Sequence, residues 1–242
     1  MKKYAFAWLL ATAMSSCTIS AWAASLQVAP ISLKFSTTEN AKEIWLTNTS
    51  DQPIRAQTRV QEWVQKDGQD VLTATKNIVA SPMVTEIPAG EKQLIRVIKI
   101  VNLPQSQEQT YRLIIDELPS TKLQEDRTGL QLLLQYSVPV FFQPNQVIAS
   151  RNGLTSLDQV EFAYHQNTIS VRNHTNSHVR ISQLNYINPN GEKIPLIKGL
   201  LGYVLAQQNM SWNFPEQLQM LPNGKFEAKI NMDSNPQILN LK

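Results

Sequence analysis

The sequence is poor in the residues that build redox, metal and phosphate sites. Its 242 residues include one cysteine, Cys17, three histidines and eight glycines. It has no Gly-x-Ser-x-Gly motif, no phosphate-binding loop and no catalytic cysteine. His174 and His178 have the i, i+4 spacing of helical metal ligands, but they lie in RNHTNSHV, whose composition predicts a turn. We therefore expect no enzymatic activity, no metal site and no cofactor.

The first residues have the layout of a secretory signal peptide. Lys2 and Lys3 precede an apolar run, and an Ala-Trp-Ala motif at 21–23 supplies the small residues of a cleavage site. We expect residues 1–24 to be removed, with cleavage after position 23 or 24. A lipoprotein site at Cys17 is the alternative. Cleavage after the motif leaves a mature chain without cysteine, which cannot form a disulfide and depends on its hydrophobic core.

Excess charge and long apolar runs are also scarce. Lys2 and Lys3 are the only charges of the leader, so the mature chain carries 20 basic and 19 acidic residues. This balance argues against a nucleic-acid partner and against membrane binding through basic residues. No second run of eighteen apolar residues follows the leader, so we expect no direct membrane insertion.

Short alternating runs dominate the rest of the chain and predict an all-β fold. Turn-forming clusters such as NTSDQP, PAGEK and NPNGEK separate them, and no long segment has the period of a helix. Many short strands at regular spacing are typical of β-sandwiches. The runs are EIWLTN, IRAQTRVQEW, KQLIRVIKI, TYRLIIDEL, VEFAY, TISVRN, VRISQLNYI, QNMSWNF and KFEAKI.

An internal repeat indicates two such domains. When the chain is shifted by 125 positions, an alternating strand that ends at Asn48 aligns with one that ends at Asn173, and an aliphatic-Arg pair begins the next strand in both copies. Asn suits such a turn because it bonds its own backbone. We predict two immunoglobulin-like sandwiches, at 25–142 and 147–242, joined by a hinge at 143–146. The matched positions are Ile44, Leu46, Asn48, Ile54 and Arg55 against Ile169, Val171, Asn173, Val179 and Arg180.

The segment GLQLLLQYSVPVFFQP, residues 129–144, carries the clearest alternation. Its leucines, tyrosine, valines and Phe142 fall mostly on one parity and its glutamines on the other, which predicts a strand with one apolar face. A polar, charged run, PSTKLQEDRTG, precedes it. From the residues alone, this face serves either the core of its own domain or another polypeptide.

Four motifs follow one another along the chain: VAPISLKF, PAGEKQLIRV, YRLIIDELP and GLQLLLQYSVPVFFQP. In this order they resemble the periplasmic chaperones of chaperone–usher pilus assembly. VAPISLKF followed by a strand ending LTNTS is similar to the first two strands of that family. PAGEKQLIRV resembles its Pro-x-Gly entry to a strand that carries arginine, and YRLIIDELP resembles its sixth strand. GLQLLLQYSVPVFFQP resembles its seventh strand and the linker to the second domain. The resemblance extends over essentially the whole mature chain and is looser in the second half.

The resemblance implies two sandwiches set in an L and a function in the periplasm. The clients would be pilus subunits, which are Ig-like domains that lack their final strand and expose a hydrophobic groove. The chaperone would lend its seventh strand to that groove until an outer-membrane usher exchanges it for another subunit's extension. Leu130, Leu132 and Leu134 match the donor positions, and Tyr136 is a fourth candidate. From Val138 onward we expect the strand to pack within its own domain.

The chain departs from the family where the best-studied members hold the terminal carboxylate of the client. The first-strand arginine position falls on Ser32 and the seventh-strand lysine position on Pro139, so neither residue supplies a charge-assisted bond. The ending YSVPVF resembles the archaic or alternative branch of the family. Arg96 and Arg112 are the candidate replacements, because both lie on otherwise apolar strands.

Arg96 has a second interpretation. It aligns with a family arginine that forms an ion pair near the cleft between the domains, and Glu108 aligns with the acidic partner. Arg59 is a weaker third candidate for the carboxylate anchor.

Two other functions remain open. A secreted Ig-like pilus subunit or surface adhesin would share the fold, although here the expected mature N-terminus, SLQVAPISLKF, enters a domain strand directly. A sugar-binding module would use exposed tryptophans, and the sequence has five, two of them in the leader. Trp45 and Trp63 occupy strand positions that predict core side chains, which leaves Trp212.

Overall fold

The computed structural model describes residues 26–104, 106–119, 132–148, 150–151, 153–214, 221 and 223–241. Across these ranges the chain forms nineteen strands and no helix, as the alternating pattern predicts. Accordingly, no described helix is long and apolar enough to span a membrane. The predicted signal peptide at 1–24 and most of the charged run that precedes the donor segment lie outside the described residues.

The first half of the chain forms a sandwich of two sheets. A four-stranded sheet has the order β1-β3-β8-β6, and a six-stranded sheet has the order β2-β10-β9-β4-β5, with β7 paired to β4. The strands are β1 (Leu26–Ala29), β2 (Leu33–Phe35), β3 (Ala41–Asn48), β4 (Ile54–Lys66), β5 (Gln69–Ala74), β6 (Ile78–Ser81), β7 (Val84–Ile87), β8 (Lys92–Lys99), β9 (Gln109–Leu118) and β10 (Gln135–Phe142).

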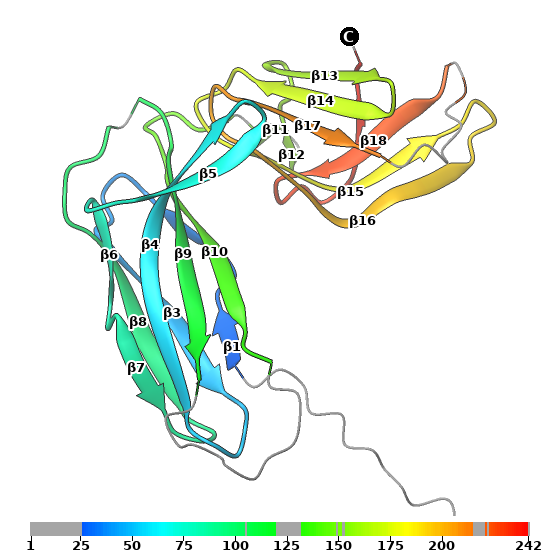
Figure 1. The fold of residues 1–242 in the computed structure, drawn as a ribbon. Coiled ribbons are helices and arrows are strands. Elements are labelled where there is room, and N and C mark those ends of the chain that lie inside the picture. The colour runs from blue at the N-terminus through cyan, green and yellow to red at the C-terminus, as the bar shows by residue number, and fades with distance from the viewer. Residues whose placement is uncertain are drawn as a thin grey trace, which may run out of the picture.

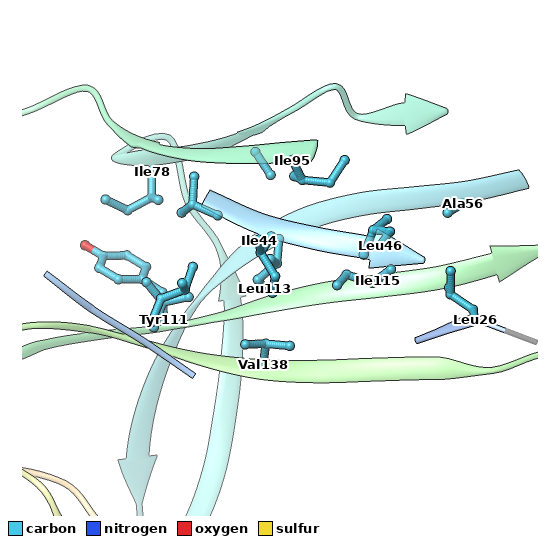
Figure 2. Close-up of a cluster of buried hydrophobic side chains, with 14 of the residues drawn as sticks. Leu26, Ile44, Leu46, Ala56, Ile78, Ile95, Tyr111, Leu113, Ile115 and Val138 are labelled. Carbon is cyan, nitrogen blue, oxygen red and sulfur yellow. The ribbon is translucent and has the colours of Figure 1, made fainter. Parts of the chain in front are cut away.

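The core of this sandwich comes from the inward parity of its strands. Ile44 and Leu46 of β3 face Leu113 of β9 and Val138 of β10, and all four are buried in one cluster. Figure 2 shows these side chains directed into the space between the two sheets. Each fully buried aliphatic side chain stabilises the fold by about 1.5–3 kcal/mol relative to exposure.

The second half forms a smaller sandwich. A three-stranded sheet has the order β13-β14-β17, a four-stranded sheet has the order β16-β15-β18-β19, and β11 pairs with β12 alone. Its own buried cluster includes Phe162, Val171 and Ile181. The strands are β11 (Ser150–Arg151), β12 (Leu154–Thr155), β13 (Val160–His165), β14 (Thr168–Asn173), β15 (Val179–Ile187), β16 (Lys193–Val204), β17 (Asn209–Asn213), β18 (Lys225–Ile230) and β19 (Gln237–Leu239).

The two asparagines of the repeat form equivalent hydrogen bonds in the two sandwiches. Asn48 and Asn173 are 0% exposed, and each donates its side-chain amide N–H groups to three backbone carbonyls. Each Oδ1 accepts from the backbone N–H and the hydroxyl two residues on, at Ser50 and at Thr175. The sequence repeat is therefore a structural repeat, in which a buried asparagine at the end of a strand closes the turn that follows.

The two sandwiches form the arms of an L, with the end of β10 at the corner (Figure 1). The joint has its own small buried cluster of Trp63, Phe141 and Leu205, against which Tyr203 packs. The fold is thus the predicted pair of Ig-like sandwiches. We propose the boundaries 25–142 and 147–242 with a hinge at 143–146, because the first core cluster ends at Phe142 and the second begins with Ile148.

Two details of the prediction are wrong. Within the described part of the segment 129–144, residues 132–134 are not in a strand and β10 covers only Gln135–Phe142. Trp45 does not lie in the core. It is 42% exposed, since Ile44 and Leu46 take the inward positions of β3 and turn Trp45 outward.

Candidate functional site

Strand β10 has an open edge along half of its length. It pairs with β9 from Gln135 to Phe142, but it pairs with β2 only from Val140 to Phe142. Among the described strands nothing else pairs with β10. Residues 135–138 therefore have a neighbour on one side only and can add a further strand on the other.

Backbone hydrogen bonds alternate in direction along β10, and this alternation identifies the residues whose N–H and C=O groups face the open edge. The backbone N–H of Glu117 donates to the carbonyl of Leu134 at 2.9 Å, so even-numbered residues bond to β9. On the other side, the N–H of Gln143 donates to the carbonyl of Phe35 at 2.9 Å. Because the phase alternates, the N–H and C=O groups of Gln135 and Ser137 point to the open edge.

The predicted donor leucines lie where β10 leaves its own sandwich. Leu132 is 72% exposed, and Leu134 is half-buried. Leu130 lies outside the described residues. The N–H of Leu134 lies 3.4 Å from a side-chain oxygen of Glu117, so this carboxylate helps to hold the start of the strand. Sequence analysis did not single out Glu117, although it belongs to the quoted YRLIIDELP motif.

Tyr136 and the residues after it belong to the first sandwich in this structure. Val138, Val140 and Phe142 are buried in its core, as predicted. Tyr136 packs against the same cluster, and its hydroxyl donates to the carbonyl of Leu26. Burial raises the pKa of Tyr136, and the nearby charge of Glu117 raises that pKa further. A role for Tyr136 as a fourth donor group stays a prediction.

The structure separates the arginine candidates. Arg96 lies on β8 in the sheet that does not contain β10, is 62% exposed, and sits 3.9 Å from Glu43 on the neighbouring strand. The predicted ion pair between Arg96 and Glu108 is wrong, since Glu108 bonds to His178 instead. The pairing failed because the alternation of β8 turns Arg96 outward, between the buried Ile95 and Val97. Arg59 contacts Asp116 on β9.

Arg112 lies at the corner of the L. It is paired in register with Pro139, and its guanidinium lies 3.6 Å from the centroid of the Trp63 ring and 5.7 Å from that of Tyr203. Its guanidinium makes no ion pair or hydrogen bond with another described residue, and the buried indole N–H of Trp63 has no partner either. Burial lowers the pKa of Arg112, and the charges of Asp70 and Tyr203 oppose that shift.

The joint between the arms is held by buried polar contacts. A side-chain oxygen of Glu108 accepts from the backbone N–H of His178 at 2.8 Å and lies 2.7 Å from its Nδ1. Phe141 of β10 stacks on the His178 ring at 3.8 Å. The side chain of Gln65 bridges to the backbone of Tyr203 and Leu205 at 2.9 Å each. Sequence analysis missed this role of His178, because its only sequence signal is the rarity of histidine.

The spaced histidines and Trp212 are the other candidate sites that the sequence suggested. His174 lies 3.7 Å from Glu161 at the surface, so the two spaced histidines have separate carboxylate partners. Within the described ranges, no group of three or more His, Cys, Asp or Glu side chains is placed to hold a metal. Trp212 packs against the second core, where a Cβ at Gly202 would lie 2.6 Å from its ring.

Known proteins share this architecture. A chain of the crystal structure of the CsuC–CsuE chaperone–tip adhesion subunit pre-assembly complex from the archaic Csu pili of Acinetobacter baumannii is 26% identical, with a TM-score of 0.66 over 90% of this chain and 98% of that one. The Pseudomonas aeruginosa CupB2 chaperone, 18% identical with a TM-score of 0.63 over 89% of this chain and 100% of that one, shows the same fold.

Sequence comparison leads to the same group. Chaperone protein PmfD of Proteus mirabilis (strain HI4320) is 27% identical over 169 residues, which cover 67% of this chain and 63% of that protein. The matched segment thus spans less than two thirds of the relative. The family model for the pili and flagellar-assembly chaperone, PapD N-terminal domain, matches residues 25–148, just over half of the chain and the whole of the sandwich that carries β10. The chain belongs to this family of pilus and flagellar assembly chaperones.

Proposed function

We propose that this protein is a periplasmic chaperone that caps pilus subunits by lending them the start of β10 and then delivers them to an outer-membrane usher. The observation that carries the proposal is the open edge of β10 beside the exposed Leu132. The binding uses backbone pairing and side-chain burial, so it needs neither catalysis nor a cofactor. Export depends on the predicted leader at 1–24.

The apolar face of β10 continues beyond the sandwich that it serves. Leu132 and Leu134 have the same parity as Val138 and Val140, which are buried in the first core. Toward Leu132 this cover is lost, since Leu134 is half-buried and Leu132 is 72% exposed. A client with an incomplete sandwich supplies the missing cover. Burial of Leu130, Leu132 and Leu134 would contribute roughly 5–9 kcal/mol before the costs of association.

Arg112 is the best-placed anchor for a client carboxylate. It lies on β9 opposite Pro139, at the inner corner of the L, where the open edge ends. Its guanidinium and the Trp63 indole N–H are two donors at one place without described acceptors. A partly buried cation in this position favours an anionic acceptor from outside the chain. Arg96 is exposed on the other sheet and is a poorer candidate.

The relatives support the same type of client. CsuC–CsuE is by its description a chaperone bound to a tip adhesion subunit, and a solved structure of Salmonella enterica is a SafA pilin in complex with the SafB chaperone. The latter is 15% identical and supports the fold only. An identity as a pilus subunit is less well supported, because β10 already occupies the last-strand place of the first sandwich, between β9 and β2.

The test is co-expression in the periplasm with a tagged pilus subunit of the same assembly system. We expect a one-to-one complex with the wild-type chain and none with Leu132→Asp, because a carboxylate would enter a dry pocket. Ile238→Asp is the matched control, since Ile238 is 46% exposed on β19 of the second sandwich. Capture by Leu132→Asp at the wild-type level would reject the proposal.

A further inference from the structure

A proline lies in the middle of β10, where proline usually breaks a sheet. Pro139 has no N–H to donate, and prolines inside sheets are confined to edges, strand starts and bulges. Yet β10 runs without interruption from Gln135 to Phe142 and stays in register with β9 over that whole length. The location of the missing N–H explains why.

The alternation of β10 directs that missing donor away from β9. The carbonyl of Leu134 accepts from Glu117 at 2.9 Å, so even positions bond to β9 and odd positions face the opposite edge. The N–H of Gln143, also at an odd position, donates to Phe35 beside β2 at 2.9 Å and gives the same phase. Pro139 is therefore accommodated without loss of a hydrogen bond to β9.

On the opposite edge, Pro139 occupies the last place before β2 begins. Strand β2 pairs with β10 only from Val140 onward. The open edge thus offers the N–H and C=O groups of Gln135 and of Ser137. At Pro139, which is buried, the register and phase of β2 place the carbonyl opposite the N–H of Leu33, so a strand added to the edge finds no free backbone group at this position.

We propose that Pro139 is a positioning residue for the client strand and ends the hydrogen-bonded ladder that β10 offers to it. The inference rests on the proposed function. A client strand forms backbone hydrogen bonds with Gln135 and Ser137 and finds no N–H to accept from at Pro139. It ends its pairing there because β2 occupies the edge of β10 from that point onward. The missing bond also weakens a complex that has to be released, without weakening the free chaperone.

Pro139→Ala tests this directly, because it restores an N–H on the open edge and leaves every bond to β9 in place. The probe is a pilus subunit of the same assembly system, and the measurement is the rate at which it dissociates from the purified complex. We expect dissociation to slow about fivefold, the factor that corresponds to one hydrogen bond of about 1 kcal/mol. The restored backbone amide at position 139 should also exchange with solvent more slowly in the complex than in the free variant.

Ser137→Pro is the converse variant, since it removes a donor one step earlier on the same edge. We expect the subunit to dissociate about fivefold faster, again by one lost hydrogen bond. Ser137→Ala, which keeps the N–H, should behave as wild type. Thermal unfolding of each free variant shows whether the sandwich itself is unchanged.

The outcomes separate this inference from the proposed function. If Ser137→Pro speeds release while Pro139→Ala releases the subunit at the wild-type rate with its new amide unprotected, the client does not reach Pro139 and the inference is wrong, although the chaperone function stands. If the wild-type chain captures no subunit, or if Leu132→Asp captures it normally, the proposed function fails and the inference fails with it.

Discussion

Strand β10 and the residues before it carry one apolar face, and the two ends of that face lie in different surroundings. Leu132 is 72% exposed, whereas Val140, on the same parity, is 0% exposed between two sheets. The side chains are chemically alike, so their roles are set by what covers them. The contrast teaches that one strand can fill the core of its own sandwich at one end and leave the same apolar face uncovered at the other.

The largest expected effect comes from putting the same charge at each end. Val140→Asp places an unpaired carboxylate in the core of the first sandwich, which we expect to cost more than about 4 kcal/mol and to unfold that domain. Leu132→Asp should leave the free chain as stable as wild type and abolish only client capture. Circular dichroism during thermal unfolding distinguishes the two variants. Equal melting temperatures for Val140→Asp and Leu132→Asp would contradict the expected difference between the two ends of the apolar face.

A smaller effect is expected at the joint that fixes the buried end. His178→Ala removes the ring that stacks on Phe141 and the Nδ1 contact to the buried Glu108 at 2.7 Å. We expect a loss of about 2–4 kcal/mol in chemical denaturation, because a buried carboxylate loses a donor. His174→Ala, at an exposed position, is the control. If both histidine variants were equally stable, the joint would not depend on this contact.

Arg112→Ala tests whether the client carboxylate binds where the two arms of the L meet. We expect it to weaken client binding about tenfold, in line with the loss of a charge-assisted bond of about 1.5–3 kcal/mol partly replaced by water. Arg96→Ala should bind as wild type, because Arg96 lies on the other sheet. Titration of the purified chaperone with a subunit measures both, and unchanged binding by Arg112→Ala would exclude it as the anchor.

The smallest effect is expected between the two ends, at Tyr136. Tyr136→Phe loses the hydroxyl bond to the Leu26 carbonyl and should cost about 1 kcal/mol. Since burial and the Glu117 charge raise the Tyr136 pKa, the fold favours the neutral phenol. The stabilisation is therefore complete below the ordinary pKa of about 10 and is lost as the pH rises past it. Above that pH, wild type should lose stability more steeply than Tyr136→Phe; parallel curves would contradict this.

Alternation and repetition in the sequence predicted the all-β fold, the pair of sandwiches and the strands β3, β4, β8, β9, β10, β13, β14, β15, β17 and β18, but they missed strands such as β5 and β16. Ile44 and Leu46 face inward because successive side chains of a strand point to opposite faces, which the sequence shows directly. Asn48 closes the turn that follows. The same alternation, applied strictly, also turns Trp45 outward, and the error there came from treating tryptophan as a core residue by type.

The contacts of the candidate site were less predictable, because they join residues far apart in the chain. Glu108 bonds to His178 rather than to Arg96, and this depends on how the two arms meet at Phe141. The open edge of β10 depends on where β2 begins to pair, which no local pattern encodes. Pro139 was visible in the sequence, but its meaning required the hydrogen-bond phase of the strand.

The most direct measurement uses the absence of cysteine from residues 25–242. Single cysteines at Leu132, Val140 and Ile238 are labelled with a thiol reagent, with and without a bound pilus subunit. The account predicts fast labelling at 132 that the subunit blocks, no labelling at 140 in either state, and fast labelling at 238 in both. Fast labelling at 132 within a complex of confirmed one-to-one composition would show that the client binds elsewhere and would contradict the central claim.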